Sequence, residues 1–110
     1  MARLMSSTEL YQRMETTEDF VLVDVLPNNQ FNEEHIPGAI NIPLEVLSEI
    51  APTKLNKNQR IIVYGQSHDN EGSSRAAEIL EALGYRKVSD FDGGIYAWKR
   101  AGYRTSKEAL

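Results

Sequence analysis

Between residues 60 and 83 the sequence holds an apolar segment, a polar loop and a segment with helical periodicity. The β-branched run at 61–64 is typical of a buried strand, and apolar residues recur at helical spacing from 76 to 83. The loop between them has Gly65 at one end and Gly72 at the other. In α/β proteins such a loop lies at the carboxyl end of a sheet strand, where backbone N–H groups converge. The sequence therefore predicts an α/β fold with its functional site at this loop.

The rest of the chain also alternates between strand and helix patterns, which predicts a mainly parallel sheet. Strands are expected over residues 20–25, 40–42, 60–64 and 87–91. Further helices are expected over residues 6–15, 30–34, 44–50 and 95–101. Residues 27–29 are interpreted as a turn, 52–59 as a polar connection and 105–110 as a loose tail. Trp98 and Ile95 share one side of the last helix and are assigned to the core.

A length of 110 residues suits one core, so residues 1–110 are interpreted as a single domain. The formal net charge of -4 and the isoelectric point near 5.1 argue against nucleic acid or an anionic membrane as the main partner. No apolar run approaches the ~20 residues that cross a bilayer, and residues 1–9 carry no signal-peptide pattern, so a cytoplasmic protein is expected. No apolar stripe is left after the core is assigned, which favours a monomer.

The sequence contains no cysteine. It therefore has no disulfide, no thiolate metal site and no cysteine nucleophile. The other potential ligands, His35, His68, Asp69 and Glu71, do not have the spacing of a metal site. Neither a metal nor another cofactor is expected.

Several segments match the signatures of one known family, in the same order along the chain. They are Val21–Val25, Phe31, His35–Pro43, Ile62–Tyr64, Leu83–Tyr85, Val88 and Asp92–Tyr103. Together, over residues 21–103, they resemble the rhodanese-like sulfurtransferase domains. The resemblance implies a three-layer α/β domain with a small, mainly parallel five-stranded sheet flanked by helices, of which the sequence pattern locates four strands.

In active members of the family that this chain resembles, a cysteine follows the strand equivalent to residues 62–64. That cysteine carries sulfane sulfur, as a persulfide, from a donor such as thiosulfate to a thiophilic acceptor, and the N–H groups of its loop hold the anionic sulfur. Here this position is Gly65, which has no side chain. The arginine that usually follows the family's first signature is replaced by Leu26, and a second cysteine found in a longer-looped subgroup would lie near Asn70.

The loop also differs in charge from a site for thiosulfate or phosphate. Asp69 and Glu71 lie within it, and His68 is expected to be neutral. Carboxylates next to an anion site oppose anion binding. With Gly65 at the catalytic position, the candidate active-site or anion-binding loop comprises Gln66, Ser67, His68, Asp69, Asn70, Glu71, Gly72, Ser73, Ser74 and Arg75.

Individual side chains of the site also have structural interpretations. Ser73 or Ser74 is expected to cap the helix, with contact to an anion as the alternative. Arg75 is expected to hydrogen-bond to loop carbonyls, or alternatively to bind an anion. Asp24 lies at a strand end that suits catalysis but is expected to tie loops together. His35 is expected to contact a helix terminus or the backbone rather than a metal.

Three other chemistries are disfavoured. Ser67, His68 and Asp69 are the residue types of a hydrolase triad, but neighbours in sequence rarely adopt its geometry. The segment from Gly65 to Gly72 differs from a P-loop in its spacing and lacks the lysine. A phosphatase related to the rhodanese fold would need the missing cysteine.

Two hypotheses from different functional classes remain. The first is a catalytically inactive rhodanese-like module that binds a protein partner or a small anion at residues 65–75. The alternative is a sulfurtransferase, for thiosulfate or another sulfane-sulfur donor, whose nucleophile at position 65 is replaced in this chain. Under the alternative, residues 66–75 form the cradle for the sulfur donor. The acidic loop favours the first hypothesis, because a recent single substitution would leave the loop suited to an anion.

Overall fold

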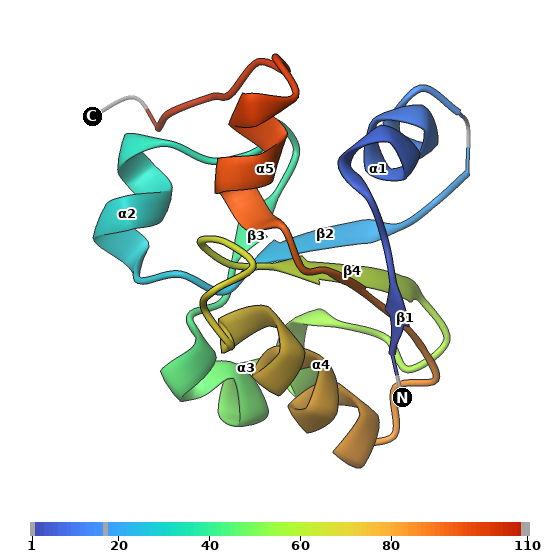
Figure 1. Cartoon of the computed structure of the whole chain (residues 1–110). Coiled ribbons are helices and arrows are strands. Elements are labelled where there is room, and N and C mark those ends of the chain that lie inside the picture. The colour runs from blue at the N-terminus through green and yellow to red at the C-terminus, as the bar shows by residue number, and fades with distance from the viewer. Residues whose placement is uncertain (1, 17, 109–110) are drawn as a thin grey trace.

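Five parallel strands form one sheet in the part of the chain that the computed structural model describes, residues 2–16 and 18–108 (Figure 1). The order across the sheet is β1-β5-β4-β2-β3, so the strand before the predicted site loop is the central one. The strands are β1 (Arg3–Leu4), β2 (Val21–Asp24), β3 (Ile40–Asn41), β4 (Arg60–Tyr64) and β5 (Lys87–Phe91). All four neighbouring pairs are parallel, which confirms the predicted sheet.

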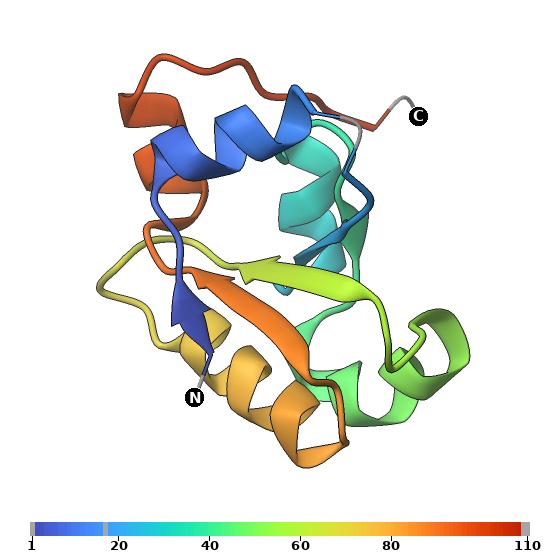
Figure 2. The ribbon, with the colours of Figure 1, turned by 90° about the vertical axis from the view of Figure 1, so that its right-hand side faces the viewer.

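Short helices cover both faces of this sheet, as Figures 1 and 2 show. One face carries α1, α2 and α5, and the other carries α3 and α4. The bounds are α1 (Ser7–Met14), α2 (Asn28–Glu33), the 3-10 turn η1 (Leu44–Val46), α3 (Leu47–Lys54), α4 (Gly72–Ala82) and α5 (Gly94–Arg100). Within the described residues, no helix is long and apolar enough to span a bilayer.

The apolar side chains of the central strands divide between two cores, because successive residues of a strand point to opposite faces. Val23, Val63 and Val88 pack toward α3 and α4, where they meet Ala76 and Leu80. The second core, on the side of α1 and α5, contains Leu22, Ile62, Tyr64, Phe91, Ile95 and Trp98. Burial on both faces explains why β4 is apolar at every position after its first residue.

Strand β1 is absent from the sequence-based prediction. It consists only of Arg3 and Leu4, both exposed, so it has neither apolar alternation nor a continuous apolar run. Its position comes from tertiary contacts: it pairs with Ser89 and Asp90 of β5, and the N–H of Met5 donates to the carbonyl of Asp90 at 3.0 Å. The total of five strands agrees with the number implied by the family resemblance.

Two boundary predictions are wrong. Residues 28 and 29 belong to α2 rather than to a turn, because Pro27 precedes the helix and its carbonyl accepts the N–H groups of the first turn. The helix predicted over 44–50 begins as the 3-10 turn η1 and continues as α3 through Lys54, so it includes Pro52. Burial of Leu47 and Ala51 in the core offsets the hydrogen bond that a proline within a helix removes.

The expectation of a loose tail from residue 105 is wrong for its described part. Ser106 and His35 form an antiparallel bridge, with N–H···O distances of 2.9 and 2.8 Å. The hydroxyl of Thr105 donates to Glu34 at 2.9 Å, and the N–H of Glu108 donates to a carbonyl of α2 at 3.0 Å. These are contacts with a distant segment, which a local sequence pattern cannot indicate. Residues 109–110 of the predicted tail lie outside the described residues.

Candidate functional site

The loop between β4 and α4 lies at the carboxyl edge of the sheet, as the sequence predicted. Its first residue, Gly65, is buried, and the start of α5 packs directly against it. The N–H groups of Ile95 and Tyr96 donate to the carbonyls of Gly65 and Gln66, each at 3.0 Å. Gly94 makes this approach possible: its φ is +66°, and a Cβ there would lie only 2.5 Å from the Gly65 oxygen. The base of the loop is therefore fastened to α5 through the backbone.

Position 65 has room for a side chain. A Cβ built on Gly65 would lie 3.6 Å from the backbone nitrogen of Ser73 and 3.9 Å from a methyl group of Val25, both ordinary contact distances. A shallow pocket of about 190 Å³ adjoins it, with apolar walls that include Leu26 and Leu44. A side chain at this position would therefore project toward the amino end of α4.

The start of α4 differs from the prediction that Ser73 or Ser74 caps the helix. The helix begins at Gly72, so both serines lie inside its first turn, and the Ser74 hydroxyl donates to the carbonyl of Glu71 at 3.0 Å. The N-cap residue is Glu71, whose side chain makes no capping hydrogen bond. The side-chain oxygen of Asn70, one residue earlier, accepts the N–H of Gly72 at 2.8 Å in a local turn, for which asparagine is a common residue.

Carboxylates surround the exposed part of the loop. Asp69 and Glu71 are exposed, and Asp92, in the turn after β5, hydrogen-bonds to Nδ1 of His68. This hydrogen bond and the charge of Asp92 raise the pKa of His68 above its ordinary value. Nothing in the sequence indicated this partner, because Asp92 lies 24 residues away from His68 along the chain.

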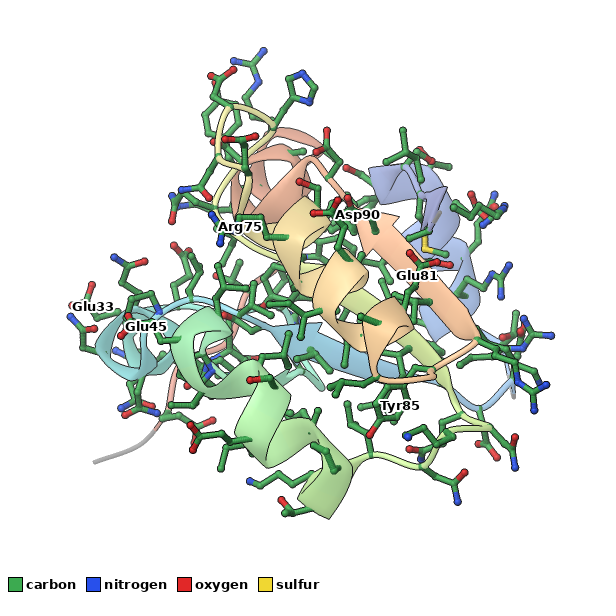
Figure 3. All side chains as sticks on the ribbon, turned by 90° about the horizontal axis from the view of Figure 1, so that it is seen from below. Glu33, Glu45, Arg75, Glu81, Tyr85 and Asp90 are labelled. Carbon is green, nitrogen blue, oxygen red and sulfur yellow. The ribbon has the colours of Figure 1, made fainter. Side chains whose placement is uncertain are left out.

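Arg75 lies on the exposed side of the first turns of α4. Figure 3 shows its side chain and that of Asp90 on opposite sides of the helix. Within residues 2–16 and 18–108, its guanidinium makes no hydrogen bond to a loop carbonyl, so the predicted structural role of Arg75 is wrong. The alternative, contact with an anion, stays a prediction.

Asp24 and Tyr64, which are register partners at the ends of β2 and β4 just before the loop, are both buried. One oxygen of Asp24 accepts the N–H of Leu26 at 2.8 Å, which is the kind of loop contact expected for it. The Tyr64 hydroxyl accepts the N–H of Ile36 at 3.0 Å. Burial raises the pKa of Asp24, and burial together with the charge of Asp24 raises the pKa of Tyr64. Tyr64 thus ties β4 to the segment after α2, and Asp24 ties the end of β2 to the residues that follow it.

His35 contacts the backbone, in agreement with its preferred interpretation. Its Nδ1 lies 2.8 Å from the carbonyl of Phe31, and the two rings stack with centroids 4.0 Å apart. The nearest carboxylate to its Nε2 is Glu108 at 3.7 Å. Among the described residues there is no group of three or more potential metal ligands. His35 thus supports the fold around α2.

The structure adds Asp90 to the residues near the loop, although the sequence analysis did not select it. Asp90 is 3% exposed on β5 and faces the first turn of α4, where Ser73 is also buried. Its Oδ1 has no hydrogen-bond partner in the described part of the chain. Burial raises its pKa above the ordinary value of 3.8. An acidic residue two positions after Val88, and therefore on the same buried face of β5, was the available signal.

Asp90→Asn is expected to stabilise the protein at pH 7. Because the pKa of Asp90 is higher in the folded state, its contribution to stability is complete below pH 3.8 and is lost as the pH rises through the raised pKa. The neutral amide avoids this loss. Urea unfolding of both proteins between pH 4 and pH 7 measures the effect. A difference in stability that does not grow with pH would contradict the assignment of a raised pKa to Asp90.

The parallel sheet, its two helical layers and the loop that follows the central strand at the carboxyl edge define the architecture of a rhodanese-like domain. The chain belongs to this family: residues 6–101 match the family described as Rhodanese-like domain. Both the predicted family and the predicted α/β fold are confirmed.

Individual relatives agree with this assignment. A protein of Allochromatium vinosum named sulfurtransferase is 31% identical over 102 residues, which cover 93% of this chain and 92% of that protein. The thiosulfate sulfurtransferase PspE of Escherichia coli is 40% identical over 72 residues, or 64% of this chain and 67% of PspE. The solution structure of the rhodanese-like domain of the Alr3790 protein from Anabaena sp. has a TM-score of 0.89 and 33% identity, over 97% of this chain and 80% of that one.

Proposed function

We propose that this chain is a rhodanese-like domain without sulfurtransferase activity, which binds a protein partner at the loop of residues 65–75. The observation that carries the proposal is Gly65 at the loop position that would hold the persulfide. Glycine offers no atom to which sulfur could be attached, and the chain has no cysteine elsewhere to replace it.

The charge and the walls of the loop support a partner that presents a cationic side chain. Glu45 and Asn70 line the pocket beside Gly65 together with apolar residues, and Asp69 and Glu71 are exposed nearby. Apolar walls accept the methylene groups of a lysine or arginine, whose charged end then reaches carboxylates at the rim. The same carboxylates oppose a small anion, which the sequence analysis left open as the ligand.

A titration followed by amide NMR tests the binding proposal, with an oligolysine peptide and sodium thiosulfate as the two probes. The peptide is expected to shift the amides of residues 65–72, and Asp69→Asn with Glu71→Gln is expected to weaken this binding about fivefold. Glu15→Gln with Glu49→Gln removes two exposed carboxylates elsewhere and serves as the matched control. Equal weakening by both double variants, or shifts with thiosulfate only, would contradict the proposal.

A second candidate is a sulfurtransferase in which position 65 has lost its cysteine. The room for a Cβ 3.6 Å from the Ser73 nitrogen favours it, since a thiolate there would lie by the amino end of an 11-residue helix. In Gly65→Cys the thiolate would attack the sulfane sulfur of thiosulfate, forming a persulfide and releasing sulfite. Mass spectrometry after incubation with thiosulfate detects the added sulfur atom. Stoichiometric loading would support this candidate, and an unmodified thiol would argue against it.

A further inference from the structure

The amino ends of the strands, at the edge of the sheet opposite the candidate loop, carry a concentration of basic residues. Five basic side chains line one pocket of about 400 Å³: Arg3, Arg13, Arg60, Arg86 and Lys87. They come from four elements or their flanks, β1, α1, β4 and β5. The whole chain has only 12 lysine and arginine residues and a net charge of -4. This pocket is therefore basic although the protein as a whole is acidic.

The sheet register aligns three of the residues at this end. Arg60 and Lys87 are direct partners on β4 and β5, so their Cα atoms lie about 5 Å apart. Val21 is the partner of Ile61, which places Phe20 just before the start of β2, next to Arg60. Phe20, Arg60 and Lys87 therefore lie side by side at the amino ends of three neighbouring strands, and they supply one aromatic ring and two cations.

Carboxylates neutralise this cluster only in part. Glu9 pairs with Arg3 and lies 3.5 Å from Arg13, while Glu18 lies 2.8 Å from Arg13 and 3.1 Å from Arg60. Within the described residues, these two carboxylates pair with three guanidinium groups and hold them in place.

Arg86 and Lys87 are both exposed, and neither has a salt-bridge partner within 4.0 Å in the described part of the chain. Glu81 of α4, labelled in Figure 3, is the acidic residue in the wall of this pocket. Positive charge therefore remains in excess at the mouth of the pocket.

Phe20 gives the pocket an apolar side. It is half-buried and lines not only the basic pocket but also two adjoining ones, of about 270 and 460 Å³. Met5 and Val88 extend the apolar surface in the basic pocket. The 270 Å³ pocket is lined by Glu18 and Asp19 against Arg13 alone, so an anion is favoured in the basic pocket and an uncharged ring in this neighbouring one.

We propose that this pocket binds a small polyanion that carries an aromatic group, of the class of nucleoside triphosphates. Its phosphates contact Arg60, Arg86 and Lys87, and its ring lies against Phe20. The size matches small-molecule sites, which occupy about 300–1,000 Å³. The site does not depend on the function proposed for the loop, because it lies at the opposite ends of the strands.

Calorimetric titration with magnesium-free ATP tests the proposal, with tripolyphosphate and adenosine as partial probes. ATP is expected to bind more tightly than tripolyphosphate, and adenosine more weakly than both. Arg86→Gln with Lys87→Gln is expected to raise the Kd for ATP about tenfold or more, because it removes two charged groups that would contact the phosphates. Neither residue has a salt-bridge partner among residues 2–16 and 18–108, so the double variant is expected to fold, and circular dichroism verifies the fold.

Two controls separate a specific site from general attraction between charges. Lys54→Gln with Lys107→Gln removes the same charge from exposed positions elsewhere and is expected to leave the Kd for ATP unchanged. Phe20→Leu is expected to weaken ATP but not tripolyphosphate. The proposal would be overturned if ATP did not bind, whether or not a single-stranded oligonucleotide did. It would also be overturned if the two double variants had equal effects on the Kd for ATP.

Discussion

Replacing Trp98 with alanine is expected to lower the free energy of unfolding by about 3–5 kcal/mol. The side chain is 2% exposed in the core that joins α1 and α5 to the sheet. Its ring lies edge-on to Phe91, with centroids 6.5 Å apart, and 4.7 Å from the ring of Tyr103. Its indole N–H donates to the carbonyl of Arg104 at 2.9 Å, so the substitution removes buried apolar area and leaves a backbone acceptor without its donor.

Urea denaturation measures this loss, and the same helix offers a control. Tyr96 is an aromatic residue of α5 with 54% exposure, so Tyr96→Ala is expected to change the free energy of unfolding by less than about 1 kcal/mol. A loss below about 1 kcal/mol in Trp98→Ala would show that α5 does not pack on the sheet as described.

Gly94→Ala is expected to destabilise the protein by roughly 2–5 kcal/mol and to displace the base of the candidate loop. Two costs combine here. The φ of +66° is unfavourable for alanine, and the new methyl group would meet the backbone of Gly65 and Gln66 at 2.5–2.8 Å. The hydrogen bonds from Ile95 and Tyr96 to this loop would then lengthen or break.

Two other glycines allow the backbone cost to be measured without the steric cost. Gly38 and Gly102 both have φ of +87°, and a Cβ on either would meet nothing within 4 Å. Their alanine variants therefore carry the backbone cost only, about 1–2 kcal/mol. Thermal or urea unfolding of the three variants gives the comparison. If Gly94→Ala costs no more than Gly38→Ala, the close contact between α5 and the loop is not present.

The sequence indicated the parts of the fold that have strong periodicity. The run at 61–64 is apolar because both faces of β4 are buried, and Trp98 recurs with Ile95 because one side of α5 faces the core. Strand β1 has only two residues and no such pattern, and its place depends on contact with residues of β5 that lie 86 positions later. The described part of the tail is likewise held by contacts with residues around His35.

The candidate site was predicted in position but not in its contacts. The strand-loop-helix order was sufficient to place Gly65 and its loop at the carboxyl edge of the sheet. The partners of that loop could not be inferred, because Gly94 and Asp92 approach from a turn more than 20 residues later. Asp90 was overlooked for a similar reason, since the helix that buries it is α4.

The central claim is that this chain has no sulfurtransferase activity. An assay of sulfur transfer from thiosulfate to cyanide tests it, run on this chain, on Gly65→Cys and on the thiosulfate sulfurtransferase PspE as the active reference. Thiocyanate formation by the unaltered chain is expected to equal the rate without enzyme, because Gly65 provides no atom that could carry sulfur. Gly65→Cys is expected to stay far below PspE, since the carboxylates of the loop oppose thiosulfate. Turnover by the unaltered chain would contradict the account, and turnover by Gly65→Cys at the level of PspE would favour a sulfurtransferase whose cysteine is replaced.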